Sequence, residues 1–201
     1  MPMLEVVSHP GVQTNLSKLN ENSKWLVAAA FLGSICRLPQ EEALWCASGA
    51  VGVSYSCKAL KKVIREPRPP GSMKPLHDPG MPSNHATGIM FWSTYMALEC
   101  GREGTPQAVL AAVATMVGSI GLAWLRVLHG QHTLRQVVVG SLLGAAGAAL
   151  WRTAGVTGAH KAIRKRRVLN RLLTVAVVCA FGNFFLKAFA KKGRRHKGTK
   201  T

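Results

Sequence analysis

The chain has 201 residues, of which 48% are hydrophobic and only 17% charged, yet Lys and Arg outnumber Asp and Glu by 26 to 8 for a formal net charge of +18. This length fits one domain. Such a charge first suggests a nucleic-acid partner, but the basic residues gather in loops and at the C-terminal end, and no nucleic-acid recognition motif accompanies them. We therefore expect no nucleic-acid partner. Cationic loops between uncharged stretches are typical of a membrane protein facing anionic headgroups.

Five cysteines are spread along the chain without a C-x-x-C pair, and most lie in or beside apolar runs. We interpret them as small buried hydrophobic residues. An odd number without regular spacing indicates neither a disulfide framework nor a zinc site. They are Cys36, Cys46, Cys57, Cys100 and Cys179.

Six apolar runs follow a polar stretch at the start of the chain, which lacks the apolar segment of a secretory signal and has no clear transit-peptide composition. Several runs are shorter than the roughly 20 residues that span a bilayer, so the pattern predicts helices but not their limits. The expected fold is all-α, an integral-membrane helical bundle of about six transmembrane helices, or five if the first run does not cross. The runs cover residues 25–36, 43–60, 86–100, 107–125, 137–151 and 172–190.

We divide the chain into a polar N-terminal lead-in over residues 1–24, a membrane domain over 25–190 and a basic tail over 191–201. Polar loops at residues 61–85 and 126–136 are separated by two apolar runs. Because two crossings return a chain to its starting side, we expect both loops on one membrane face. Basic residues lie on both sides, so the positive-inside rule does not set the orientation.

Aromatic, small and acidic residues give further cues to the packing. Four tryptophans lie at the ends of runs, where an aromatic belt would place them: Trp25, Trp45, Trp124 and Trp151. Three glycines allow close helix contacts: Gly140, Gly144 and Gly147. Glu99 is costly within a span, so we expect it to mark the end of its run.

Cations and imidazoles dominate the two polar loops. An arginine fork can bind two phosphate oxygens and a lysine acts as a point charge, which indicates a phosphate ligand. One neutral imidazole can attack phosphorus while a second, protonated one donates to the leaving oxygen. Gln136 lies one turn after His132 on the same helix face and is a candidate orienting partner. The cations and histidines are Lys61, Arg68, Arg126, His85 and His132.

Carboxylates are scarce in this chain, and Asp78 is its only aspartate. A magnesium or two-metal phosphatase uses several carboxylates near its site. We therefore expect no metal and no other cofactor. Glu66 and Asp78 flank the first polar loop, and we assign them structural or substrate-positioning roles.

Three motifs, Lys61-x6-Arg68-Pro69, Pro82-Ser83-Asn84-His85 and Arg126-x5-His132, together resemble the signature of the type 2 phosphatidic acid phosphatase superfamily in order and spacing. That superfamily includes lipid phosphate phosphatases, polyisoprenyl diphosphatases and vanadium haloperoxidases. The stretches at 23–28, 78–83 and 128–139 look most like the plastid epsilon-type lipid phosphate phosphatases of plants and algae. Dolichyl diphosphatases are the next most similar group.

The resemblance implies a phosphohistidine mechanism in which His132 is the nucleophile and His85 the general acid. It also implies that Lys61, Arg68 and Arg126 hold the phosphate, with Ser83 and the backbone of Asn84 assisting. The sequence departs from the usual pattern at three positions, where Asn84 replaces a glycine, Leu125 a serine and Gln136 an aspartate. Glutamine can accept a hydrogen bond from the imidazole but supplies no negative charge.

These features predict a membrane enzyme that removes phosphate from a lipid phosphomonoester, with phosphatidate as the first substrate to test and diacylglycerol as its product. The partners implied are a lipid substrate and the bilayer, while the sequence leaves the oligomeric state open. A polyisoprenyl (dolichyl) diphosphate is the alternative substrate. A catalytically silent lipid-binding or scaffold protein is the alternative function. The expected location is a plastid membrane, with the endoplasmic reticulum as the alternative.

His129 is the rival nucleophile, and only the spacing from Arg126 favours His132 over it. We interpret His77 as a loop residue. Other basic residues are interpreted as headgroup-facing or solvated charges: Lys62, Arg65, Lys74, His160 and the run 164–167.

Overall fold

A computed structural model describes residues 10–70, 72, 78–158 and 165–197 of the chain. His77, Lys74 and His160 therefore lie outside the described residues, as do the first nine residues and the last four. Every regular element of the described part is an α-helix. The helices are α2 (Pro10–Ile35), α3 (Gln40–Ile64), α4 (Asn84–Glu103), α5 (Pro106–Leu128), α6 (Leu134–Val156) and α8 (Arg167–Lys197).

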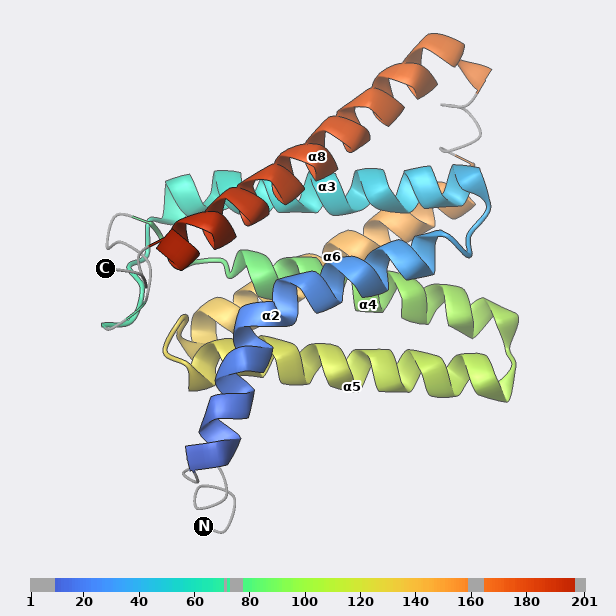
Figure 1. Cartoon of the computed structure of the whole chain (residues 1–201). Coiled ribbons are helices and arrows are strands. Elements are labelled where there is room, and N and C mark those ends of the chain that lie inside the picture. Colours follow the sequence, from blue (N-terminus) through green and yellow to red (C-terminus); the bar gives the residue numbers. More distant parts are fainter. Residues whose placement is uncertain (1–9, 71, 73–77, 159–164, 198–201) are drawn as a thin grey trace.

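Helix α4 lies at the centre of the bundle, where it packs mainly against α6 and α5 (Figure 1). Helix α3 contacts α4 and α6, while α8 packs on α3, and α2 crosses over α3, α4 and α5. The end of α3 and the start of α4, like the end of α5 and the start of α6, lie at the left end of the bundle in Figure 1. The two polar loops therefore meet at one end, as the count of apolar runs predicts.

Local signals explain where the central helices begin and end. Thr105 caps α5 by accepting a hydrogen bond from the Ala108 N–H at 3.2 Å, and Pro106 occupies the first turn, where no N–H is needed. Helix α4 ends at Gly104, whose φ of +66° is in the left-handed region that favours glycine. A two-residue link between α4 and α5 makes them an antiparallel hairpin.

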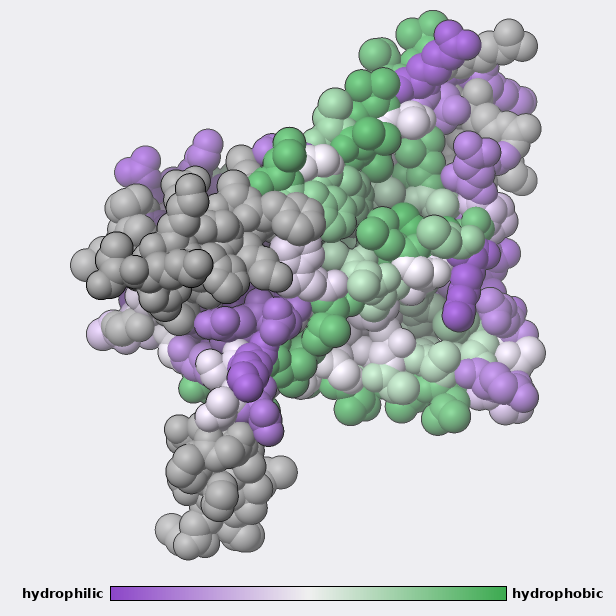
Figure 2. All heavy atoms as spheres, viewed as in Figure 1, coloured by the Kyte–Doolittle hydropathy of each residue, from purple (hydrophilic) through white to green (hydrophobic). Residues whose placement is uncertain are grey.

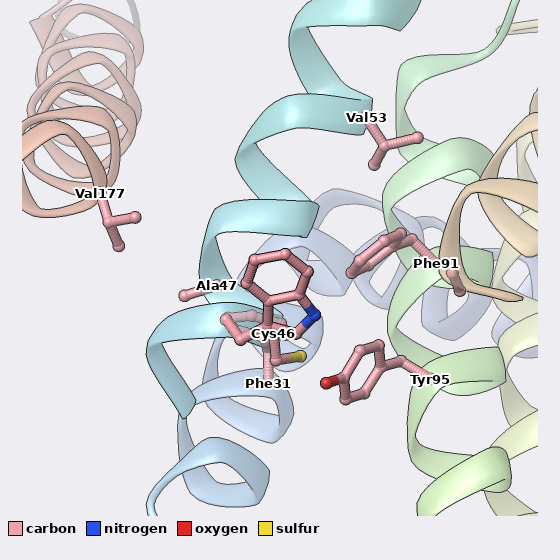
Figure 3. Packing of buried hydrophobic residues seen from close by; sticks show 9 residues of the cluster. Phe31, Cys46, Ala47, Val53, Phe91, Tyr95 and Val177 are labelled. Atoms are coloured by element: carbon pink, nitrogen blue, oxygen red, sulfur yellow. The ribbon is translucent and has the colours of Figure 1, made fainter. Parts of the chain in front are cut away.

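The main hydrophobic core lies between α3 and α4 and continues onto α2 and α8 (Figure 3). Phe91 and Tyr95 of α4 point toward α3, where Cys46 and Val53 face them. Cys46 is fully buried, in agreement with its interpretation as a small hydrophobic residue, and so is Cys57, whereas Cys36 and Cys179 are exposed.

Glycines on α6 allow its backbone to lie against α4. A Cβ atom added at Gly144 would lie 2.2 Å from the Thr87 carbonyl oxygen, and one at Gly140 would lie 2.6 Å from the Ser83 carbonyl oxygen. These distances are far below van der Waals contact, so any larger residue at either position would force the two helices apart. The close helix contact expected at both positions is confirmed.

Large apolar side chains point outward over the middle of the bundle. In Figure 2 they form a central hydrophobic band with hydrophilic residues at both ends. Helices α5 and α6 are each long and apolar enough to cross a membrane, and only 22% and 28% of their most apolar segments are buried inside the bundle. Leu110 and Val117 on α5, for example, are exposed. An outward apolar surface on both helices suits contact with lipid.

Two features at the end of the bundle remote from the polar loops were not expected, and one of them overturns a prediction. Arg152, one position after the apolar run 137–151, lies in α6, where it is buried and forms an ion pair with Glu99 of α4. Trp45 and Trp151 do not form part of an outward belt. Their rings stack at 4.5 Å, and each indole N–H donates to the backbone carbonyl of the other, at 3.0 and 2.8 Å.

The polar stretch over residues 1–24 contributes to the first helix. Helix α2 begins at Pro10, so the expected boundary after residue 24 falls inside a continuous helix. Asn20 and Ser23 of this stretch are buried. The part of α2 around Asn20 and Ser23 is therefore packed against the bundle, while its first turns project away from it (Figure 1).

Candidate active site

Helix α6 begins with the residues that orient His132. Thr133 accepts a hydrogen bond from the Gln136 N–H, and the Gln136 side chain accepts one from the Thr133 N–H, both at 3.3 Å. This reciprocal capping box fixes Gln136 at the first turn of the helix. Its Oε1 lies 3.1 Å from Nδ1 of His132. The helix start thus places the amide beside the imidazole, as the spacing predicts.

The orientation of the Gln136 amide follows from its other partners. Its Nε2 donates to Oε1 of Glu66 at 3.0 Å and to the Pro67 carbonyl at 2.8 Å. Both are acceptors, so the nitrogen must face them and Oε1 must face His132. Because Oε1 can only accept, Nδ1 of His132 carries the proton. The second ring nitrogen, Nε2, is then the unprotonated one that carries a lone pair.

Arg68 connects His132 to the first polar loop. Its Nη1 lies 3.0 Å from Nε2 of His132 and donates to the Gln131 carbonyl at 3.0 Å. On the other side, Arg68 donates from Nη2 to the Asp78 carboxylate at 3.2 Å and from Nε to the Asp78 carbonyl at 3.1 Å. This contact requires a lone pair on Nε2, which agrees with the tautomer assigned from Gln136.

Burial, together with the positive charge of Arg68, lowers the pKa of His132 from 6.5 to about 3. The hydrogen bond to Gln136 acts in the opposite direction, and the charges of Lys61 and Arg126 add to the lowering. His132 is thus neutral at physiological pH. A neutral imidazole is the form that can attack an electrophile.

The start of α4 presents several buried polar atoms that have no hydrogen-bond partner among the described residues. They are Oγ of Ser83, Oδ1 of Asn84 and Nε2 of His85. Ser83 precedes the first turn of α4, where the first backbone N–H groups also have no partner within the helix. Buried polar groups of this kind are normally paired, so a set of unpaired ones indicates a place for a polar ligand.

Arg126 reaches the same region from the last turn of α5. It donates from Nη2 to Oγ of Ser23 on α2 at 3.2 Å, while its Nε is buried and has no partner among the described residues. Arg126 is close enough to His132 and to His85 to interact with both electrostatically. Part of its guanidinium is therefore fixed by α2 and part is open to a ligand.

Lys61, at the end of α3, donates from Nζ to the Pro79 carbonyl at 2.6 Å, which joins the two ends of the first polar loop. His129, the rival nucleophile, instead caps α5, since its Nδ1 lies 2.9 Å from the Leu125 carbonyl. The structure thus places Lys61, Arg68, His85, Arg126, His132 and Gln136 at one end of the bundle, with Ser83 and Asn84 at the start of α4.

Over the described ranges, no group of three or more His, Cys, Asp or Glu side chains is arranged to hold a metal ion. Asp78 and Glu66 are engaged by Arg68 and Gln136, respectively. The fixed charge available to a ligand at this end of the bundle is positive and comes from lysine and arginine.

Comparison with known proteins agrees with this geometry. The family model of the PAP2 superfamily matches residues 42–160, which include all three motifs. The chain belongs to the PAP2 superfamily.

Two curated relatives come from Arabidopsis thaliana. The chain is 38% identical over 136 residues to "Lipid phosphate phosphatase epsilon 2, chloroplastic", an alignment that covers 66% of this chain and 46% of the relative. It is 32% identical over 152 residues to "Lipid phosphate phosphatase epsilon 1, chloroplastic", covering 74% of this chain and 52% of that relative. The chain thus spans about half the length of these relatives. No solved structure matches it.

Two contacts at this PAP2 site could not be found from the motifs. Ser23 lies 103 positions before Arg126, in a stretch with no apolar run. Glu66 lies between two motif residues, but nothing in the spacing assigns it to Gln136, which is 70 positions away. Both contacts depend on how helices and loops meet in space.

Proposed function

We propose that this chain is a membrane lipid phosphate phosphatase that hydrolyses a lipid phosphomonoester, with phosphatidate as substrate and diacylglycerol as product, through a phosphohistidine on His132. The observation that carries this proposal is the unprotonated Nε2 of His132 beside Arg68, in the electrostatic range of Lys61 and Arg126. A neutral nucleophile among fixed cations suits attack on an anionic phosphate.

In the first step, the Nε2 lone pair of His132 forms a bond to phosphorus and the bond between phosphorus and the lipid oxygen breaks. His85, which takes up a proton once the anionic phosphate is bound beside it, gives that proton to the leaving oxygen. The Arg68 guanidinium, which contacts Nε2 of His132 in the free protein, now donates its hydrogen bond to the phosphoryl oxygens. Lys61 and Arg126 neutralise the remaining negative charge of the phosphate. In this assignment, Oγ of Ser83 and the N–H groups at Asn84 complete the phosphate site.

In the second step, water attacks phosphorus and the bond to Nε2 of His132 breaks. Neutral His85 accepts a proton from the water, so inorganic phosphate leaves and both histidines return to their starting forms. Gln136 holds the Nδ1 proton throughout, which keeps Nε2 as the reacting nitrogen. Each step therefore uses residues of this chain, and we propose that activity needs no metal.

The apolar outer surface of α5 and α6 supports the proposed bilayer setting. We propose that the membrane domain covers residues 25–190 and includes segments of all six helices, that the site lies at headgroup depth, and that residues 191–201 form a basic tail. The names of the two relatives support a plastid membrane as the location.

The test is phosphate release by the purified chain in detergent with EDTA, using phosphatidate and dolichyl diphosphate side by side. We expect release from phosphatidate, inhibition by vanadate, and labelled phosphate on His132 after a rapid alkaline quench, with the label lost on acid treatment because phosphohistidine is stable in alkali and labile in acid. Preference for the diphosphate would overturn the substrate assignment. Release from neither substrate would favour a silent lipid-binding protein, and a strict magnesium requirement would overturn the metal-free mechanism.

Variants separate the roles of the histidines. His132→Ala should abolish release and labelling, while His129→Ala, the matched control in the same loop, should retain both. His85→Ala should lose about 10² to 10⁴-fold with phosphatidate, the usual contribution of a general acid. It should recover much of this loss, or release one equivalent in a burst, on an aryl phosphate, whose leaving group needs less proton donation. Label on His129 or His85 would overturn the assignment.

A further inference from the structure

The Gln136 side chain connects two groups that the proposed mechanism has not yet linked. One face of its amide accepts from Nδ1 of His132 at 3.1 Å, and the opposite face donates to Oε1 of Glu66 at 3.0 Å. A carboxylate, an amide and an imidazole therefore form one continuous chain of hydrogen bonds. Chains of this kind are polarised along their length, so a charge at one end is felt at the other.

We propose that Glu66 is a positioning residue of the active site, whose carboxylate acts through the Gln136 amide to stabilise the positive charge that His132 acquires when it forms its bond to phosphorus. This inference rests on the proposed function of His132 as the nucleophile. When Nε2 attacks, the ring keeps its Nδ1 proton and becomes cationic. A glutamine alone offers only a dipole to that cation, whereas the glutamine bonded to Glu66 also transmits a negative charge.

The Gln136 amide is held too firmly to turn. Its nitrogen bonds to Glu66 and to the Pro67 carbonyl, and its oxygen accepts from His132 and from the Thr133 N–H. The side chain is fully buried. Reversing the amide would break all four contacts, so the direction from Glu66 to His132 is fixed.

The backbone around Glu66 is held in the same way. The Gly80 N–H donates to the Glu66 carbonyl at 2.7 Å. Gly80 also packs on the Gln136 amide so closely that an added Cβ would lie 2.4 Å from Nε2. Gly80 and Glu66 thus both contact the amide, and the Glu66 carboxylate is held against it.

The charges around His132 explain why such a carboxylate matters. Arg68, Lys61 and Arg126 all oppose a positive charge on the ring. The other acid of the loop, Asp78, is bonded to Arg68 at 3.2 Å instead of to His132. Of the two acids of this loop, Glu66 is the one that a hydrogen-bonded chain connects to His132.

The test removes the carboxylate charge at position 66, adds one at position 136, and combines the two changes. Glu66→Gln keeps the size and an acceptor oxygen but removes the charge, and we expect kcat to fall about 10 to 100-fold with KM and thermal stability unchanged, the usual scale for a residue that supports a reacting group through another. Gln136→Glu should be worse, because two carboxylates then face each other. The double variant E66Q/Q136E restores a donor opposite a carboxylate, so it should exceed Gln136→Glu by at least about 10-fold.

Two further measurements distinguish the proposed role of Glu66 from a purely structural one. Glu103→Gln, a loss of the same charge at the opposite end of α4, is the matched control and should keep the wild-type rate. Histidine-selective NMR should show that the Nδ1 proton signal of His132 shifts in Glu66→Gln, a readout that does not depend on turnover. The inference is overturned if Glu66→Gln retains wild-type kcat, or if E66Q/Q136E is no better than Gln136→Glu. Failure of the proposed function would instead appear in the wild type, as missing label on His132.

Discussion

Replacing Gly144 with alanine tests whether the contact between α4 and α6 holds the two histidines in place. His85 lies in the first turn of α4, and His132 immediately precedes the cap of α6. A Cβ at residue 144 would lie 2.2 Å from the Thr87 carbonyl oxygen and 2.9 Å from the Phe91 backbone nitrogen. Both atoms belong to the backbone of α4, so no side chain can rotate to relieve the clash.

The size of the effect follows from these distances. Normal van der Waals contact begins at 3.4 Å, so the helices must separate by roughly 1 Å. Overpacking of this kind costs about 1 to 3 kcal/mol. Alanine recovers about 1 kcal/mol because it favours the helix over glycine. The net loss is up to about 2 kcal/mol, which lowers Tm by a few degrees in a chain of this length.

Catalysis should suffer more than stability. Misplacing a reacting group by about 1 Å can cost about 10²-fold, so we expect kcat for phosphatidate to fall by about that factor. Gly88→Ala on α4 is the control, because an added Cβ there meets nothing within 4 Å. It should raise Tm slightly and leave kcat unchanged. If Gly144→Ala matched this control in both measurements, the contact would not be setting the geometry of the site.

Three other perturbations have outcomes that follow from single contacts. Glu99→Ala leaves Arg152 as a buried, unpaired charge and should cost about 3 to 5 kcal/mol of unfolding free energy, measured by denaturation in detergent. Ser23→Ala removes the hydrogen bond that steadies Arg126, so KM for phosphatidate should rise about 2 to 10-fold with Tm nearly unchanged. The lowered pKa of His132 means that the unfolded chain binds a proton which the folded chain excludes between pH 6.5 and about 3. The free energy of unfolding should therefore decrease as pH falls through that window, because protonation of His132 favours the unfolded chain. His132→Ala should remove that part of the pH dependence.

Each of these perturbations has a matched control or a contradicting result. Arg102 also pairs with Glu99, but at 3.6 Å and with 62% of its side chain exposed, so Arg102→Ala should cost less than about 1 kcal/mol. Ser34→Ala on α2 removes only a bond to the carbonyl of the helix itself and should leave KM unchanged. Equal effects of the paired variants, or the same pH profile with and without His132, would contradict the contacts described.

Hydropathy and motif spacing predict the helices and the meeting of the two polar loops, because both depend on short stretches of chain. The Glu99–Arg152 pair could not be predicted in this way. In the sequence, each residue alone indicates the end of an apolar run. Both can be buried only because they pair with each other, and they are 53 positions apart in the chain. The polar half of α2 was missed for a related reason. Its buried residues, Asn20 and Ser23, are hydrophilic and leave no apolar signal.

The two ends of α4 differ in a way that explains where the chemistry belongs. At its C-terminal end, Glu99 is matched by Arg152, and Trp45 and Trp151 close the neighbouring contact between α3 and α6 with reciprocal hydrogen bonds. At its N-terminal end, the buried polar atoms of Ser83 and His85 lack partners among the described residues. Unpaired polar groups destabilise a fold unless a ligand pairs with them. Paired polar groups thus fix helix α4 at its C-terminal end, and this stability allows unpaired polar groups at its N-terminal end. The phosphate of the proposed substrate supplies the oxygens that would pair with them.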